Sequence, residues 1–194
     1  LIYQLNGIAL IALLVSFAYG IVGFLDDFIK IIKKRSLGLR AYQKIIGQFG
    51  IAIIAAVYAY QNEHIGSQIY LPFTDKTLDL GIFYIPFAVF VIIAIVNAMN
   101  LTDGLDGLAS GVTTVMMSTM MVIIGYLAIK VGEAGNTELQ RQLYESNVSS
   151  PLHFTNVRGL ATFCAIVVGA NLGYLRYNIY PARIIMGDMG AFLL

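Results

Sequence analysis

The chain has 194 residues, of which 58% are apolar and only 12% are charged. Ordinary soluble domains contain about 45–50% apolar and about 25% charged residues. A composition this poor in charge excludes a typical water-soluble domain and indicates a membrane protein whose partner is the lipid bilayer. The formal net charge of +1, without a basic stripe interleaved with aromatic residues, excludes nucleic acid as an expected partner.

Charge-free apolar runs predict the membrane-spanning helices, because a helix needs about 20 apolar residues to cross a bilayer and central charges are costly. The runs are Leu1–Leu25, Ile45–Asn62, Leu80–Thr102, Gly107–Ile129 and Gly159–Leu175, and another begins at Met189. We predict an all-α, polytopic transmembrane helical bundle with five crossings and the start of a sixth. We expect residues 1–194 to be a single membrane-embedded domain, truncated at both ends.

The connections between these runs predict the orientation of the chain. Those after the first, third and fifth runs hold eight of the twelve Lys and Arg residues, so the positive-inside rule places them in the cytoplasm. On the opposite face, Ile69, Leu71 and Phe73 alternate with other residues before a Thr-Asp-Lys-Thr turn. This pattern predicts a short β-hairpin on the outer face.

Acidic residues on the predicted cytoplasmic face each adjoin the start or end of an apolar run. They are Asp26, Asp27, Asp103, Asp106 and Asp188. Carboxylates at the membrane edge are costly unless they pair or bind a cation, which makes them functional candidates. Since Mg²⁺ prefers oxygen ligands and shares them with phosphates, carboxylates beside basic residues on one face predict phosphoryl transfer with Mg²⁺.

The segment Asn97–Gly107 carries a polar residue at every third position. The four residues of this series are Asn97, Asn100, Asp103 and Asp106. A regular helix would spread this series about halfway around its axis. The polar residues can share one site only if the helix ends, which Gly104 and Gly107 favour. Capping of the next helix by Asp106 explains one residue of the four, so we favour a site.

The other acidic residues have structural alternatives that the sequence leaves open. Asp26, in the pair that closes the first run, could simply pair with Lys30 one helical turn later. Asp188 could cap the helix that follows it. The position of all three acidic clusters on the same predicted face favours a shared site.

Four segments together resemble the MraY family of the polyprenyl-phosphate N-acetylhexosamine-1-phosphate transferase superfamily. They are Phe24–Lys30, Lys33–Leu39 with Gln43, Lys44 and Gln48, Asn97–Gly107, and Asn178–Asp188. The resemblance implies a ten-helix fold with a cytoplasmic cleft in the bacterial inner membrane. It implies a homodimer that uses UDP-MurNAc-pentapeptide, undecaprenyl phosphate and Mg²⁺ to produce lipid I and UMP for peptidoglycan.

The resemblance also implies catalytic roles. Asp26 would activate or position the prenyl phosphate, with Asp27 beside it. Asp188 would bind Mg²⁺ with help from Asn100, and Lys44 would hold phosphate charge in the cleft. Direct attack by the prenyl phosphate needs only positioning and charge neutralisation, so we expect it over a covalent phospho-enzyme, which the sequence leaves open.

The remaining candidates implied by the resemblance contact the nucleotide or line the cleft. They are Asn97, Leu101, Asp103, Gly104, Leu105, Asp106 and Asn178. Asp103 would lie near the diphosphate and ribose, and Asp106 near the uracil. The chain departs from the family at Ile185, where an aromatic residue is usual, and at Met189, where a Thr is usual, so nucleotide affinity is expected to differ.

Other classes of protein predict different patterns. A sister transferase family would act on another UDP-sugar. A UbiA-type prenyltransferase would need a second Asp-x-x-x-Asp cluster, whereas Lys30 stands three residues after Asp27. An ion-coupled transporter would place its carboxylates near the middle of the membrane, whereas these lie at the edges of apolar runs.

Overall fold

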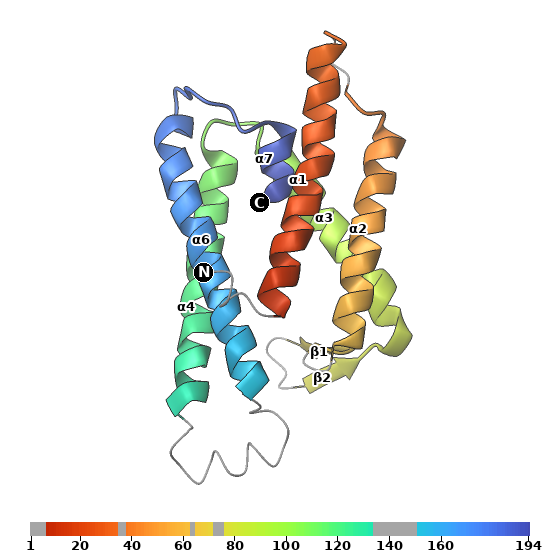
Figure 1. Ribbon diagram of the computed structural model, residues 1–194, viewed down its shortest axis with the longest axis vertical. Helices are drawn as coiled ribbons and strands as arrows, with labels where there is room; N and C mark the ends of the chain where they lie inside the picture. The colour runs from red at the N-terminus through yellow and green to blue at the C-terminus, as the bar shows by residue number, and fades with distance from the viewer. Residues whose placement is uncertain (1–6, 35–37, 63–64, 72–75, 134–150) are drawn as a thin grey trace. The chain divides into compact units, whose positions relative to one another are not determined.

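The computed structural model describes residues 7–34, 38–62, 65–71, 76–133 and 151–194. In chain order its elements are α1 (Ile8–Ile32), α2 (Ala41–Gln61), β1 (Gln68–Leu71), β2 (Lys76–Asp79), the 3-10 helix η2 (Gly81–Phe83), α3 (Tyr84–Thr102), α4 (Leu108–Glu133), α6 (Pro151–Asn178) and α7 (Gly187–Leu193) (Figure 1). Five of the described helical segments are long and apolar enough to cross a membrane: α1, α2, η2 with α3, α4 and α6. The predicted all-α polytopic architecture is confirmed.

The first helix extends further than its apolar run. We predicted that Asp26 and Asp27 would close the crossing after Leu25, but α1 continues to Ile32 and both residues lie in its last two turns. No Gly or Pro follows before Gly38, and Lys30 supplies an opposite charge within the helix. The run of apolar residues therefore predicts the part of the helix suited to lipid, whereas the helix itself continues into polar sequence.

The chain divides into two compact units, which are described separately. One unit comprises Leu1–Leu14 and Asp103–Ile185, and the other comprises Val15–Thr102 and Met186–Leu194. In the first unit α4 and α6 pack along each other (Figure 1), and Ala109, Ser110 and Cys164 are buried there. Small residues of this kind allow close approach of helices where lipid gives no hydrophobic drive for association.

In the second unit α2 and α3 lie side by side (Figure 1). Ala52 and Ala56 on α2 are fully buried and form a core with Val89 on α3. On the preceding turns of α2, a Cβ at Gly47 would be in ordinary van der Waals contact with Val22 on α1. Small residues on α2 thus allow the second unit to pack closely around this helix.

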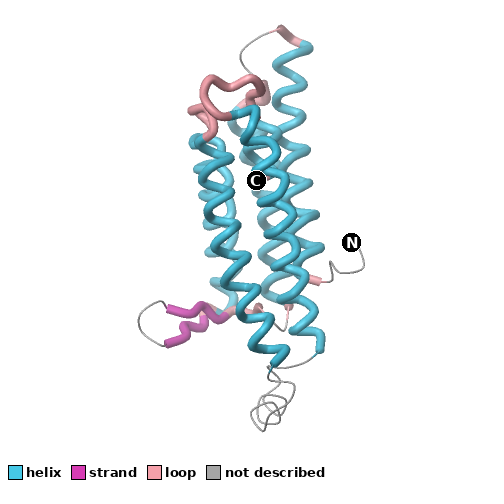
Figure 2. The backbone as a smooth tube through the Cα atoms, turned by 90° about the vertical axis from the view of Figure 1, so that its left-hand side faces the viewer, coloured by secondary structure: helices cyan, strands magenta, loops and turns pink. Residues whose placement is uncertain are grey.

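The predicted β-hairpin is present. Strands β1 and β2, magenta in Figure 2, pair antiparallel with Ile69 opposite Leu78, and residues 72–75, with part of the predicted turn, lie outside the described residues. Ser67 Oγ and Gly81 N donate to Asp79 Oδ1 over 2.5 and 2.9 Å. These hydrogen bonds, the one from Ser67 first, lower the pKa of Asp79 and close the base of the hairpin.

The loop between α3 and α4 breaks the helix where the sequence predicts. α3 ends at Thr102, and α4 begins at Leu108, directly after Gly107 with a φ of +74°. A residue with a side chain is strained in this left-handed region, so glycine is favoured there. The break separates Asn97 and Asn100, which lie within α3, from the residues that follow it.

Replacing Gly23 by Ala tests the close packing of α1 against α7. A Cβ at Gly23 would lie 2.7 Å from Met189 Cα, so a backbone must move, whereas a Cβ at Gly50 would meet nothing within 4 Å. We expect Gly23→Ala to lower the free energy of unfolding by about 1–3 kcal/mol, as overpacking does. Gly50→Ala, the control, gains helix propensity and is expected to be neutral or slightly stabilising. Unfolding of the full-length protein in detergent measures both, and equal stability of the two variants would contradict this packing.

Candidate functional site

Carboxylates from two helices meet in the second unit. Asp26 and Asp27 come from the last two turns of α1, and Asp188 comes from the first turn of α7. Each offers an oxygen, and these three oxygens lie within 4.8 Å of one another. Together with Lys30 of α1 and Lys44 of α2 these residues are called the carboxylate–lysine cluster.

The two lysines bridge the three carboxylates. Lys30 Nζ lies 2.6 Å from Asp26 Oδ2, 3.1 Å from Asp27 Oδ1 and 2.9 Å from Asp188 Oδ2. Lys44 Nζ lies 2.7 Å from Asp188 Oδ2 and 3.2 Å from Asp26 Oδ2. With every group ionised, the carboxylates exceed the ammonium groups by one negative charge, so the cluster favours a further cation.

Asp26 is the buried member of the cluster, with 1% of its surface exposed. Its Oδ1 accepts a hydrogen bond of 2.8 Å from Leu39 N, and the backbone of Gly38 comes so close that a Cβ there would lie 2.6 Å from the same oxygen. Oδ2 faces the two lysines, but no donor among the described residues is aligned with it for a hydrogen bond. Asp26 therefore holds the loop before α2 through one oxygen and turns the other toward the cluster.

Asp27 positions the start of α7. Its Oδ2 accepts a hydrogen bond of 3.0 Å from Met189 N. The same oxygen would lie 2.9 Å from a Cβ at Gly187, whose φ is +67°, so glycine is suited there by both space and backbone conformation. This contact carries α7 to the end of α1 and places Asp188 beside the lysines.

Asp188 receives donors from three helices. Asn100 Nδ2 of α3 donates to Oδ1 over 3.0 Å, while Lys30 and Lys44 donate to Oδ2. Burial acts to raise the pKa of Asp188, but its hydrogen bonds, those from Lys44, Lys30 and Asn100 among them, lower it on balance. The alternative that Asp188 caps the helix is not supported, because Met186 is the N-cap and no side chain bonds there.

Other candidates in α3 lie at different depths. Asn97 Nδ2 donates to Gln48 Oε1 over 2.8 Å and to Ile93 O, one turn from Asn100 and away from the helix end. Leu101, near the end of α3, is 82% exposed. Among these α3 candidates, Asn100 contacts a carboxylate of the cluster, and Asn97 joins a polar layer one helical turn away.

The first unit holds the remaining candidates in and around the α3–α4 loop. Asp106 Oδ2 accepts a hydrogen bond of 3.0 Å from Ala182 N, and α4 begins two residues later, so Asp106 is not its N-cap. Leu105 is 69% exposed. Asp103 and Gly104 occupy the same loop. Asp106 thus ties the loop to the segment that follows α6.

Asn178, predicted to line the cleft, is 4% exposed and its amide is engaged within the unit. Gly107 N and Ser110 Oγ donate to its Oδ1 over 3.1 and 3.0 Å. Its Nδ2 donates to Ile184 O over 3.0 Å. Asn178 therefore joins the start of α4 to the segment after α6, a structural role that its sequence position did not indicate.

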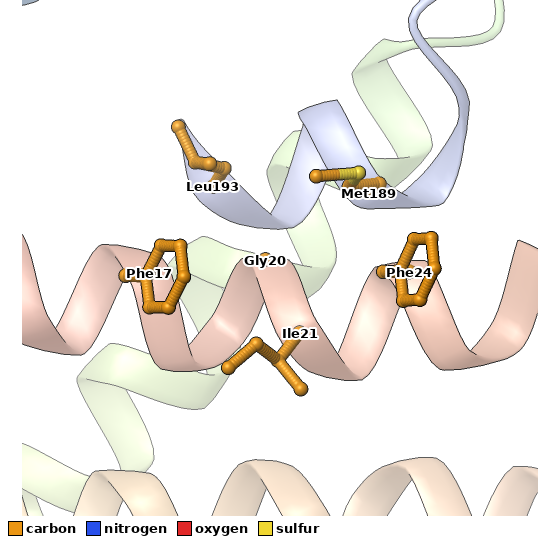
Figure 3. Close-up of a pocket in the computed structure, with 6 residues that line it drawn as sticks. All are labelled: Phe17, Gly20, Ile21, Phe24, Met189 and Leu193. Carbon is orange, nitrogen blue, oxygen red and sulfur yellow. The ribbon is translucent and has the colours of Figure 1, made fainter.

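An apolar pocket of about 270 Å³ lies between α1 and α7 in the second unit (Figure 3). Its lining comes from α1 and α7: Phe17, Gly20, Ile21, Phe24, Met189 and Leu193. Phe24 stands two residues before Asp26, and Met189 follows Asp188 directly. The two helices that bring the carboxylates together thus also enclose an apolar space.

Lys30 is the cluster residue that the sequence did not identify as part of the site. Its sequence position indicates an ion pair with Asp26 on the helix surface, whereas in the structure it contacts all three carboxylates. The available signal was its spacing, because it stands three and four residues after the two aspartates on one helix face. Its contact with Asp188 depends on the packing of α7 and has no signal in the local sequence.

Comparison with known proteins gives the family. Residues 9–194 match the family described as Glycosyl transferase family 4. The phospho-N-acetylmuramoyl-pentapeptide-transferase of Clostridioides difficile (strain 630) is 47% identical over 176 residues, which are 91% of this chain and 46% of that protein. The proteins of the same name from Clostridium novyi (strain NT) and Clostridium kluyveri are each 44% identical, over 91% and 96% of this chain and 46% and 50% of theirs. The chain spans about half the length of these curated relatives. Because the family match takes in nearly the whole sequence, the chain belongs to glycosyl transferase family 4.

Proposed function

We propose that the full-length protein transfers phospho-MurNAc-pentapeptide from UDP-MurNAc-pentapeptide to undecaprenyl phosphate, giving lipid I and UMP in peptidoglycan synthesis. Relatives that are 47% and 44% identical to this chain are named phospho-N-acetylmuramoyl-pentapeptide-transferase. The observation that carries the proposal is the carboxylate–lysine cluster, because three carboxylates beside two lysines suit a reaction between phosphate groups. We further propose that it acts as a homodimer on the cytoplasmic face of the bacterial inner membrane.

The cluster suits a magnesium ion. Mg²⁺ takes oxygen ligands, usually from one or two carboxylates, and completes its shell with water and substrate phosphate. Asp188 and Asp27 expose part of their side chains. The buried Oδ2 of Asp26 lies near both lysines but has no aligned hydrogen-bond donor within the part of the chain that the structure describes. Asp188 would hold the ion with Asp27 beside it and Asn100 orienting Asp188. When bound, Mg²⁺ would neutralise charge on the reacting phosphates.

The lysines supply the positive charge that the phosphates need. Lys44 and Lys30 are held next to the carboxylates by ion pairs of 2.6–3.2 Å, and each keeps part of its surface exposed. They would bind and orient the diphosphate and the attacking prenyl phosphate, which is most of what phosphoryl transfer requires. Asp26, 1% exposed, would act on the prenyl phosphate through these two lysines.

The nucleotide would occupy the residues around the α3–α4 loop. Asp103 would lie near the diphosphate and ribose, and the loop residues with Leu101 would frame the uracil. The further candidates are Asn97, Gly104, Leu105, Asp106 and Asn178. Asn178 and Asp106 support this proposal as anchors of the loop, since Asn178 accepts a hydrogen bond from Gly107 and Asp106 accepts one from Ala182, both at the end of the loop next to α4.

The apolar pocket supports a lipid acceptor. A polyprenyl phosphate carries an apolar chain directly attached to its phosphate. Its binding site therefore needs an apolar surface next to an ionic one. The pocket lined by Phe17, Phe24 and Met189 lies on the two helices, α1 and α7, that carry the three carboxylates of the cluster (Figure 3). The prenyl units next to the phosphate would lie in this pocket.

Asp188→Asn tests the proposed metal site. The change removes the charge of Asp188 while keeping its size. Loss of a residue that only supports a metal ligand lowers activity by about 10–100-fold. Loss of the ligand itself is therefore expected to lower UMP release by at least about 100-fold. Asp79→Asn in the β-hairpin is the matched control and is expected to keep wild-type turnover. UMP release by the purified full-length protein is measured over a range of Mg²⁺ concentrations. Near-normal turnover by Asp188→Asn would remove Asp188 from the metal site.

Omitting one component at a time tests the proposed substrates. UMP release from UDP-MurNAc-pentapeptide is expected only when polyprenyl phosphate and Mg²⁺ are both present, because the acceptor supplies the attacking oxygen. The assay is repeated with UDP-N-acetylglucosamine as the donor. Turnover of that nucleotide in place of UDP-MurNAc-pentapeptide would assign the protein to a sister family of transferases.

A further inference from the structure

A second polar layer lies one helical turn from the carboxylate–lysine cluster. Gln48 stands four residues after Lys44 on α2, and Asn97 stands three residues before Asn100 on α3, so the members of each pair share a helix face. Asn97 Nδ2 donates to Gln48 Oε1 over 2.8 Å, and Tyr19 OH donates to Gln48 O over 2.9 Å. The layer joins α1, α2 and α3. The same three helices supply the donors to Asp188, which are Lys30, Lys44 and Asn100.

A buried glutamine at position 48 lowers the free energy of unfolding relative to an apolar residue if it contributes only packing. Its surface is 1% exposed, and its Nε2 has no hydrogen-bond acceptor among the described residues. A buried amide group without a partner costs free energy that an apolar side chain would not. The next turns of α2 place Ala52 and Ala56 against α3, which shows that this interface packs well with apolar residues.

The geometry next to Gln48 suggests what the amide does. Lys44 Nζ reaches Asp188 Oδ2 over 2.7 Å from α2, and Asn100 Nδ2 reaches Asp188 Oδ1 over 3.0 Å from α3. The two helices therefore hold the two oxygens of one carboxylate. Hydrogen bonds weaken when their length changes by a few tenths of an ångström or their angle falls, so both contacts need a fixed register of α2 against α3.

We propose that Gln48 is a positioning residue that fixes this register through its hydrogen bond to Asn97. It sets the distance between Lys44 and Asn100 and so holds both against Asp188. Because Gln48 is buried, it acts through these residues and does not itself touch a substrate. Its effect on turnover rests on the proposed function, whereas its effect on the position of Lys44 does not.

The first test measures the reactivity of Lys44 in the full-length protein. Gln48→Met keeps the length of the side chain but removes the hydrogen bond, so Lys44 is expected to be acetylated by an amine-reactive reagent several-fold faster. Lys30 is the internal reference, because two of its three carboxylate contacts, those with Asp26 and Asp27, lie within α1 and do not depend on α2. Tyr19→Phe, the control variant, removes the other hydrogen bond of the layer and is expected to leave both rates unchanged.

Two further variants separate positioning from loss of folding. Gln48→Asn keeps the amide but is one methylene shorter, so it is expected to expose Lys44 as Gln48→Met does. The swap of Gln48→Asn with Asn97→Gln restores the combined length and is expected to restore the protection of Lys44. If Gln48→Met fails to fold, Gln48→Asn and the swap provide the same comparison.

Kinetics give the second measurement. Gln48→Met is expected to lower kcat for UMP release about tenfold, as loss of a residue that orients metal-site groups does. Wild-type labelling of Lys44 in Gln48→Met, or equal effects of Gln48→Met and Tyr19→Phe, would overturn the proposal. Absence of UMP release by the wild-type protein would instead overturn the proposed function, and the labelling result would still decide the role of Gln48.

Discussion

Ion pairing of three crowded carboxylates with two ammonium groups is the interaction on which the second unit depends. Lys30 and Lys44 connect the end of α1, the start of α2 and the start of α7, and Asn100 adds the end of α3. Removing one partner from a buried ion pair costs more than the pair contributes, because the other charge is left uncompensated. The residues proposed to perform the chemistry are therefore also those that hold these helix ends together.

Close backbone approaches make this arrangement possible. Gly23 admits the backbone of α7 against α1, Gly38 admits the loop before α2 against Asp26, and Gly187 lies against Asp27. A Cβ at any of these positions would come within 3 Å of another atom. Glycines at these three points thus allow carboxylates from separate segments to face the same lysines, while the Gln48–Asn97 layer supports them from the adjacent turn.

Much of the fold could be predicted from the sequence, because apolar runs and polar interruptions report directly on lipid contact. The same reasoning selected Asp26, Asp27, Asn100 and Asp188, whose side chains lie together in the structure, since carboxylates and amides at the ends of apolar helices are unusual. It could not find the three contacts of Lys30, because these depend on how α7 packs. It also did not find the burial of Asn178, whose partners lie up to 71 residues away in the chain.

The position of a bound metal ion tests the role of the cluster most directly. Crystals of the full-length protein grown with UMP and Mn²⁺, which replaces Mg²⁺ and scatters anomalously, would reveal it. A peak at about 2.0–2.2 Å from a carboxylate oxygen of Asp188, with Lys30 or Lys44 moved away from that oxygen, is expected if the cluster holds the catalytic metal. A Mn²⁺ ion bound away from Asp188, with both lysines still bridging Asp26 and Asp188, would contradict it.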